Sequence, residues 1–447
     1  MGEGLLSTAP TVAAEAVWED PSGLFEDAGL ERGPDGVLRM GGLSLDAIAA
    51  DVGTPAYLYH APSIRRRYRE LTAAFAPLAA KVYFAVKANG NLAVLRLLRE
   101  LGAGADIVSG GELARARAAG FEPRSIVFSG VGKGVDELAA AVEAGVGSIN
   151  LESADELSAL ERLVAGRDLR EPVRLGIRVN PDVAAATHPY ITTGASGIKF
   201  GVPADQVPML ASRVATNPRF KLVNLAMHLG SQILDPAPIV AGAEKLRGLL
   251  DSIRGSGIGT VEALDIGGGL GIRYQDETPL SPVALAAGLS PILAGAGVAL
   301  HLEPGRYLIG SAGVLLARVL FRKQSGGKHF VIVDAAMNDL VRPSHYQAHH
   351  AIVEVTRHRR GVRIVDVVGP VCETGDFLAL DRPLPSVEPG ETLAVLCAGA
   401  YGFTMASNYN TRPRPPEVMV DRGRYAVARP RETIESILAA EKAEPFA

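Results

Sequence analysis

Lys87 stands close to the end of the apolar segment VYFAVKANGN, residues 82–91. A lysine at such a position has two possible explanations. Either its strand is half exposed and the side chain points to water, or its amine is a chemical reagent. Burial removes water from an ammonium group and lowers the pKa of a lysine, so that its amine can condense with an aldehyde. Other motifs of the chain are needed to choose between these explanations.

Two glycine-containing segments, DIGGGLGI (265–272) and EPGR (303–306), could bind an anion. Adjacent glycines let backbone amides approach an anion closely, because no Cβ atom intervenes. Neither a dinucleotide fingerprint nor a P-loop is present. GGGLGI has Ile272 at its sixth position, and GVGKGV (130–135) has Gly134 where a P-loop requires Ser or Thr. The expected anion is therefore the single phosphate of a small cofactor.

A reactive lysine together with a phosphate-binding loop is what pyridoxal 5′-phosphate (PLP) requires. This cofactor also needs a protein group that tunes its ring nitrogen. Glu303 begins the EPGR segment and is suited to that task. The sequence therefore predicts a PLP site, in which Lys87 is the point of attachment.

The elements that position these residues repeat one pattern from about residue 55 to residue 309: a short apolar run, then a helical stretch rich in Ala, Leu, Arg and Glu. Eight strands alternating with helices over about 250 residues are typical of a (β/α)₈ barrel, whose active sites lie at the C-terminal ends of the strands. An open doubly wound sheet is the alternative, but its usual glycine fingerprint is missing after the first strand. The expected strands are 82–86, 104–108, 126–129, 148–151, 174–179, 222–228, 262–266 and 299–303.

The remainder of the chain is divided as follows. Residues 310–447 are rich in β-like runs broken by Pro and Gly, which predicts a second, all-β domain. Residues 21–54 are expected to join that domain, and residues 1–20 to be a flexible N-terminus. The barrel itself is expected to span residues 55–309. Two helix starts, SGGE (109–112) and SADE (153–156), have capping-box spacing.

Bulk composition excludes several classes of protein. The net charge of −4 does not favour nucleic acid or an anionic membrane as a partner. No run approaches the roughly 18 apolar residues of a membrane helix. The acidic N-terminal segment does not resemble a signal peptide. Two cysteines in 447 residues exclude a disulfide framework and predict a reducing, cytoplasmic location. No metal site is expected.

Six segments resemble, in order, the motifs of the fold-type III PLP-dependent decarboxylases, and most closely those of the diaminopimelate decarboxylases. The resemblance spans roughly residues 35–440. HPYITTG…GIKFG (188–201) and DAAMNDLVRPSHY (334–346) favour this branch, whereas ornithine decarboxylases typically have an aspartate in place of Glu373. The six segments are YFAVKAN (83–89), HLGSQI (228–233), DIGGGLG (265–271), EPGR (303–306), VCETGD (371–376) and GAYGFTMASNYN (399–410).

The resemblance implies a role for each matching residue. Lys87 would form the internal aldimine, His228 would stack on the ring and Glu303 would pair with the ring nitrogen. Cys372 would protonate the carbanion from the partner subunit of a homodimer, so that two chains share each site. The residues implied around the phosphate and cofactor are Ser231, Gly268, Gly269, Pro304, Gly305, Arg306 and Tyr401. Those implied in substrate binding are Arg306, Arg342, Tyr346, Glu373 and Tyr401.

The activity implied is decarboxylation of meso-2,6-diaminopimelate to L-lysine and CO₂, the last step of lysine biosynthesis. Arginine suits the distal carboxylate of this substrate and Glu373 its distal amine. Three alternatives remain: a decarboxylase of another diamino acid or of a tethered amino-acyl substrate, an amino-acid racemase, and a non-catalytic PLP carrier. Glu303 argues against the racemase, and the β domain argues against the carrier. Ala336 and the segment YQAHH (346–350) depart from the family pattern at the edge of the expected substrate pocket.

Overall fold

The computed structural model describes residue 20 and residues 23–183, 193–194 and 197–441. Of the segment 188–201 singled out above, residues 188–192 and 195–196 lie outside the described residues. The expected flexible N-terminus lies outside them as well, except for Asp20. Within the described residues, no helix is both long and apolar enough to cross a lipid bilayer.

The chain forms two compact units. Of the described residues, one contains 61–183, 193–194, 197–273 and 277–310, and the other contains 20, 23–60, 274–276 and 311–441. The first unit therefore begins six residues later than the barrel boundary expected from the sequence. The second includes β4 (Ala56–His60), which pairs antiparallel with β14 (Gly313–Ser325) and parallel with β20 (Glu417–Asp421).

The first unit is a closed parallel barrel. Each strand pairs with the next one around the ring, and β13 closes the ring by pairing with β5 through Leu302 and Val82. The strands are buried on both faces, as their nearly continuous apolar sequences require. The expected (β/α)₈ barrel is thus confirmed. Its strands are β5 (Lys81–Ala85), β6 (Gly104–Ile107), β7 (Ile126–Phe128), β8 (Ser148–Leu151), β9 (Val173–Asn180), β11 (Phe220–Ala226), β12 (Ala263–Asp265) and β13 (Ala299–Leu302).

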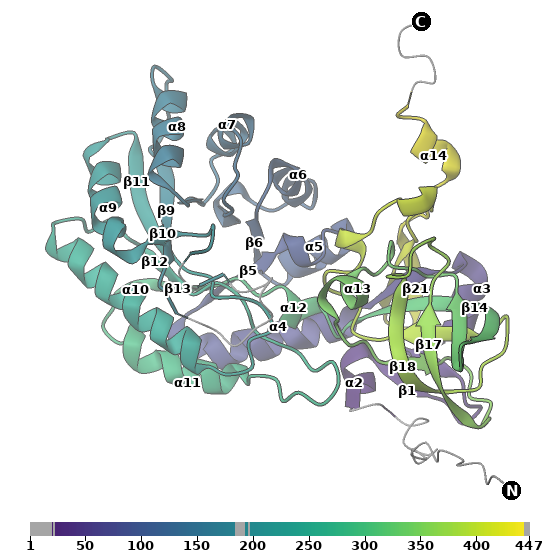
Figure 1. The fold of residues 1–447 in the computed structure, drawn as a ribbon. Coiled ribbons are helices and arrows are strands. Elements are labelled where there is room, and N and C mark those ends of the chain that lie inside the picture. Colours follow the sequence, from purple (N-terminus) through teal and green to yellow (C-terminus); the bar gives the residue numbers. More distant parts are fainter. Residues whose placement is uncertain (1–19, 21–22, 184–192, 195–196, 442–447) are drawn as a thin grey trace, which may run out of the picture. The chain divides into compact units, whose positions relative to one another are not determined.

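Helices surround the ring of strands, as Figure 1 shows for α6 to α10. A short strand, β10 (Val202–Pro203), extends the sheet beside β9. The barrel helices are α4 (Ala61–Phe75), α5 (Leu92–Glu100), α6 (Gly110–Ala118), α7 (Val135–Ala144), α8 (Ala154–Val164), α9 (Val207–Thr216), α10 (Ala237–Gly255), α11 (Pro282–Leu293) and α12 (Arg306–Ile309).

The two predicted helix caps form in part as expected. Ser109 Oγ accepts a hydrogen bond from the N–H of Glu112 at 3.2 Å. The Glu112 carboxylate, however, accepts from the N–H of Val108, one residue before the cap. The pair Ser153 and Glu156 repeats this arrangement at the start of α8. Each cap therefore also fixes the end of the preceding strand, which stabilises the C-terminal rim of the barrel.

The second unit is β-rich. Its main sheet has the order β18-β17-β15-β14-β4-β20-β21, and β19 pairs with both β14 and β16. A small antiparallel sheet is formed by β1 (Leu30–Arg32), β2 (Leu38–Met40) and β3 (Leu43–Ser44). The other elements are α2 (Leu24–Ala28), α3 (Leu45–Val52), β15 (Lys328–Val333), α13 (Arg342–Tyr346), β16 (Ile352–Glu354), β17 (Val362–Val368), β18 (Phe377–Pro385), β19 (Thr392–Val395), β21 (Arg424–Arg429) and α14 (Ile434–Leu438).

Candidate active site

Lys87 lies at the C-terminal rim of the barrel, in a short 3₁₀ turn (Val86–Ala88) that directly follows β5. Its Nζ atom is 2.8 Å from Oδ2 of Asp106, which stands on the neighbouring strand β6. About a third of the lysine side chain is exposed, whereas the aspartate is fully buried. Lys87 is therefore held by an internal carboxylate at the rim where barrel enzymes build their sites.

His228 follows β11 at the same rim. The backbone N–H of Gly268 donates a hydrogen bond to its Nδ1 atom at 3.2 Å, so the proton of the neutral ring is on Nε2. Burial and the nearby charges of Lys87 and Arg178 hold the pKa of His228 well below its usual range. The ring is accordingly neutral at physiological pH and can offer a flat, uncharged face.

Glu303 and Asp265 form a buried carboxyl pair at the ends of β13 and β12. They hydrogen-bond to each other, which requires a proton on one of the two groups. Burial raises the pKa of Asp265 to about 7. Burial and the charges of Asp106 and Asp265 raise the pKa of Glu303 well above its usual range. Among the described residues, no donor group hydrogen-bonds to Oε1 of Glu303 or Oδ2 of Asp265.

The glycine-rich loop after β12 lies against the loop after β13. A Cβ atom at Gly268 would lie 2.2 Å from the carbonyl oxygen of Glu303, so only glycine fits there. Gly269 has φ +103°, which also requires glycine. In the described part of the chain, the backbone N–H groups of Gly269 and Gly305 find no acceptor. Two amides on adjacent loops are thus available to an anion.

Arg306 and Ser231 complete this part of the rim. A guanidinium nitrogen of Arg306 donates to the hydroxyl of Ser231 at 3.0 Å, and Arg306 is buried. The carbonyl of Pro304 accepts the N–H of Ala85 at 3.2 Å, which links the loop after β13 to the strand that carries Lys87. A positive charge and two open amides therefore lie together.

These residues fit PLP on the observations above. The cofactor has an aldehyde, a ring nitrogen and a phosphate. Lys87 offers an amine, the buried Oε1 of Glu303 has no hydrogen-bond donor and can accept a ring N–H, and the amides of Gly269 and Gly305 with Arg306 suit a phosphate. The residues that the sequence assigned to the cofactor in the barrel thus meet at one rim.

The remaining expected site residues belong to the β-rich unit. Arg342 begins α13 and is buried. Its Nη1 atom donates to the hydroxyl of Tyr274 at 2.8 Å and to Nε2 of His350 at 3.0 Å, and its guanidinium lies 4.7 Å from the centre of the Tyr274 ring. His350 Nδ1 donates to the carbonyl of Leu396 at 2.8 Å, which leaves Nε2 as the acceptor. Arg342 is therefore fixed by both neighbours.

Four further residues of this unit were expected at the site. Tyr346 ends α13, and its ring centre is 4.5 Å from that of His345. Cys372 and Glu373 are exposed in the loop before β18. Tyr401 follows β19 and adopts φ +56°, a conformation that is uncommon for tyrosine.

Ala336, one of the two departures from the family pattern, is fully buried in the same unit. Its N–H donates to Oδ2 of Asp339 at 2.9 Å. A Cβ atom at Gly369 would lie 2.6 Å from Ala336 Cβ. Ala336 therefore has a packing role between two loops. The other departure, YQAHH, includes His350, which contacts Arg342 directly.

Sequence reasoning missed Asp106 as a site residue, and gave Asp265 no role although it begins a quoted motif. Each is an acidic residue inside an otherwise apolar strand, GADI and ALD. A charged residue is rarely buried without a partner. That signal alone could have placed both carboxyl groups inside the barrel.

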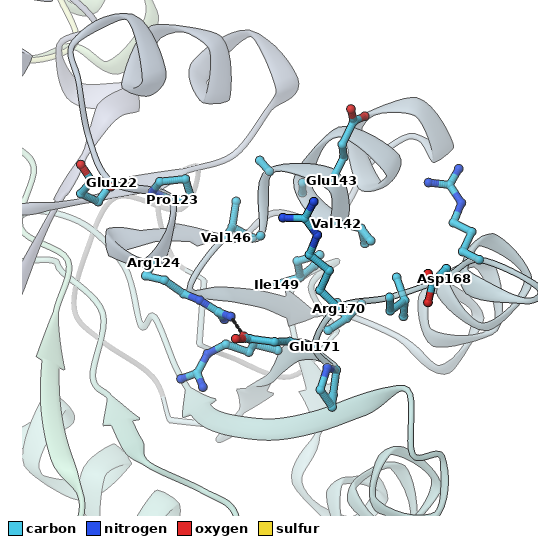
Figure 2. Close-up of a pocket in the computed structure, with 18 residues that line it drawn as sticks. Glu122, Pro123, Arg124, Val142, Glu143, Val146, Ile149, Asp168, Arg170 and Glu171 are labelled. Atoms are coloured by element: carbon cyan, nitrogen blue, oxygen red, sulfur yellow. Dashed lines mark hydrogen bonds and ion pairs between the residues drawn. The ribbon is translucent and has the colours of Figure 1, made fainter.

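A surface depression of about 740 Å³ lies at the opposite rim, near the N-terminal ends of β7, β8 and β9. Figure 2 shows Arg124 in an ion pair with Glu171 at its side. Arg174, also in its lining, pairs with Glu262. Catalytic residues of barrel enzymes come from the C-terminal ends of the strands, so this depression is not the candidate active site.

Comparison with known proteins identifies the family. Residues 61–310 match the model of the pyridoxal-dependent decarboxylase, pyridoxal binding domain. The diaminopimelate decarboxylase of Pseudomonas aeruginosa is 46% identical over 411 residues, which are 92% of this chain and 98% of that protein. That of Aquifex aeolicus is 46% identical over 406 residues, 90% of this chain and 95% of that protein.

Solved structures agree with this result. The crystal structure of the Helicobacter pylori diaminopimelate decarboxylase, complexed with L-lysine, has a TM-score of 0.85 and 38% sequence identity. The match covers 88% of this chain and 98% of that one. The chain therefore belongs to the pyridoxal-dependent decarboxylases, in the group of the diaminopimelate decarboxylases.

Proposed function

We propose that this protein uses PLP to decarboxylate meso-2,6-diaminopimelate to L-lysine and CO₂, which is the last step of lysine biosynthesis. The observation that carries the proposal is the placement of Lys87 beside a buried, proton-holding carboxyl pair and a glycine-rich anion cradle. The relatives named above, including one solved with L-lysine, support the choice of substrate and product.

Bound at this rim, PLP supplies an electron sink for the electron pair that remains on Cα when the carboxylate leaves as CO₂. Lys87 provides the attachment point, and Asp106 holds its ammonium group in place while the amine is not engaged. The raised pKa of Glu303 keeps a proton available in this buried carboxyl pair, and Glu303 can share it with the ring nitrogen. A ring nitrogen that stays protonated draws electrons more strongly.

The product requires one proton at Cα, and we assign its delivery to the thiol of Cys372. Glu373 is assigned to the distal ammonium group of the substrate and Arg342 to the distal carboxylate. A guanidinium binds a carboxylate through two parallel hydrogen bonds, which Lys cannot provide. Tyr346 and Tyr401 are assigned to the border of the same pocket.

We further propose a homodimer in which Cys372 and Glu373 act on the partner's barrel. Their exposure at the surface of the β-rich unit supports this arrangement, because residues that act across an interface must be accessible in the single chain. The thiol must also stay reduced to serve as an acid, which supports a cytoplasmic location.

The test is turnover by the purified, PLP-supplied protein. We expect L-lysine and CO₂ from meso-diaminopimelate and none of the corresponding amines from L-ornithine or L-arginine. Lys87→Ala should lose at least about a thousandfold in turnover. Lys81→Ala, at the exposed start of the same strand, is the matched control. Bound PLP without lysine formation would contradict the substrate assignment, and retained activity in Lys87→Ala would contradict the assigned site.

A further inference from the structure

The loop that carries Cys372 and Glu373 is exposed but well fixed. We call residues 371–376 the Cys–Glu loop. At its end, the carboxylate of Asp376 accepts the backbone N–H of Val371 at 2.7 Å and that of Met337 at 2.7 Å. Asp376 is buried, and this burial raises its pKa. The base of the loop is therefore tied down by one carboxyl group, while Cys372 and Glu373 extend beyond it.

A second segment, residues 407–411, contacts both of these residues and is called the Tyr–Asn loop. Asn410 Oδ1 accepts the backbone N–H of Cys372 at 2.9 Å. The hydroxyl of Tyr409 lies close enough to the carboxylate of Glu373 for the two groups to interact. This interaction with Glu373 raises the pKa of Tyr409. Two consecutive side chains thus lie beside two consecutive residues, and Asn410 holds the backbone of the first.

The Tyr–Asn loop is itself anchored. Asn408 Nδ2 donates to Oε2 of Glu432 at 2.7 Å and to the carbonyl of Arg412 at 3.0 Å. Arg414 forms an ion pair with the same Glu432. These bonds hold the loop in a backbone conformation that is unfavourable for its residues.

The unfavourable conformation is visible in two backbone torsion angles of this loop. Asn410 has φ +53° and Thr411 has φ +56°. Asparagine tolerates this region, but a β-branched residue such as threonine rarely occupies it. Unfavourable backbone conformations persist where the surroundings impose them, and they cluster at functional sites.

We propose that Tyr409 and Asn410 are positioning residues for the decarboxylation. Asn410 holds the Cys372 backbone in the place from which the thiol delivers its proton. Tyr409 holds the Glu373 carboxylate in one orientation for the distal ammonium group of the substrate. This inference rests on the roles proposed above for Cys372 and Glu373.

The physical reason is pre-organisation. An exposed glutamate samples several rotamers, and ordering it on binding costs free energy. A phenol that occupies one acceptor site of the carboxylate fixes the side chain and leaves its other acceptor sites for an ammonium group. Such fixed side chains suit a site whose groups must be held within a narrow range of positions.

The test separates binding from chemistry. Tyr409→Phe removes only the hydroxyl, and we expect KM for meso-diaminopimelate to rise about tenfold with a smaller change in kcat. The matched control is Tyr425→Phe, because Tyr425 also lies beside an exposed carboxylate: its hydroxyl donates to Asp51 at 2.9 Å. Its KM should stay at the wild-type value.

For Asn410 two variants separate the hydrogen bond from the backbone. Asn410→Gly keeps the positive φ without strain but removes the acceptor, and kcat should fall about tenfold with KM little changed. Asn410→Asp keeps an acceptor oxygen and tolerates the same φ, so it should restore most of kcat. A purely structural role would instead lower the melting temperature and PLP content, which are measured alongside.

A readout independent of activity is the alkylation rate of Cys372 by iodoacetamide. Cys397 is buried, so the exposed Cys372 should dominate labelling. Releasing the Cys372 backbone in Asn410→Gly should change this rate at least about twofold, while Tyr425→Phe should leave it unchanged. In ultraviolet titration, Glu373→Gln should lower the pKa of Tyr409 towards its ordinary value.

The outcomes distinguish the two proposals. If Cys372→Ala and Glu373→Gln lose activity but Tyr409→Phe and Asn410→Gly match the wild type, the positioning roles are wrong and the proposed function stands. If Cys372→Ala and Glu373→Gln keep full activity, the assigned proton donor and amine contact are wrong, and the positioning roles are overturned with them.

Discussion

The Nζ atom of Lys87 lies 2.8 Å from Oδ2 of Asp106, which has no exposed surface. The two residues come from adjacent strands of the barrel, and Asp106 also contributes to the raised pKa of Glu303. One buried charge therefore influences both ends of the proposed cofactor site: the amine proposed to attach PLP and the carboxyl group proposed to face the ring nitrogen.

Asp106→Asn keeps the size of the side chain and removes its charge. We expect the pKa of Glu303 to fall, because one cause of its elevation is removed. The value of kcat should fall about tenfold, and the alkaline limb of its pH profile should move to lower pH. Asp136→Asn, an exposed acid in the first turn of α7, is the control. If Asp106→Asn kept the wild-type kcat and the wild-type pH profile, Asp106 would have no influence on the cofactor site.

The carboxyl group of Asp265 should make the stability of the PLP-free protein depend on pH. Its pKa is raised from 3.8 to about 7 in the folded state, so the folded state binds the proton more tightly. The contribution of this protonated carboxyl group to the free energy of unfolding is therefore fully present below about pH 4 and is lost as the pH rises to about 7.

Asp265→Asn removes that dependence and keeps the acceptor for the N–H of Gly267. Between pH 4 and 7 the free energy of unfolding of the wild type should fall more steeply than that of the variant, by up to about 1.4 kcal/mol per pH unit. Denaturant unfolding at several pH values measures the difference. The exposed Asp251→Asn should keep the wild-type slope. Equal slopes in wild type and Asp265→Asn would disprove the assignment.

Gly268→Ala should disrupt the anion cradle. The added Cβ atom would lie 2.2 Å from the carbonyl oxygen of Glu303, so the loop must move. We expect the Kd for PLP to rise at least about tenfold, because the backbone amides leave their positions. Gly259→Ala is the matched control, since a Cβ atom there meets no atom within 4 Å. Fluorescence titration with PLP measures both, and wild-type affinity in Gly268→Ala would argue against the cradle.

Arg342→Lys tests the proposed contact of Arg342 with the distal carboxylate of the substrate. Lysine keeps the positive charge but loses the planar fork and the stacking on Tyr274. We expect KM for meso-diaminopimelate to rise about tenfold or more. Arg322→Lys, at an exposed ion pair with Glu388, should have no effect. A wild-type KM in Arg342→Lys would remove this residue from the proposed substrate contacts.

The sequence by itself determined the barrel and the chemistry expected at its rim. Strand and helix patterns are local, and eight βα repeats leave few architectures that bury their apolar strands. Lys87, Glu303 and the glycine-rich loop are also local signals, because each stands directly after a strand. The barrel topology then requires the ends of parallel strands to meet at one rim, which is why separate motifs could be combined into one site.

Tertiary structure decided what depends on contacts between distant segments. Asp106 pairs with Lys87 across two strands, and Asp265 pairs with Glu303. The pKa values of these groups follow from burial and from neighbouring charges, neither of which is visible in a local pattern. The pairing of β4 with β14 and β20 is of the same kind, since it joins residues more than 250 positions apart.

The contacts of Asn410 with Cys372 and of Tyr409 with Glu373 were also decided only on folding. Both pairs lie in irregular loops separated by more than 30 residues. Loops have no period that predicts their partners, and their form depends on side-chain hydrogen bonds such as that of Asn408 to Glu432. The sequence therefore determined which residues can do chemistry, and the tertiary structure determined which residues hold them in place.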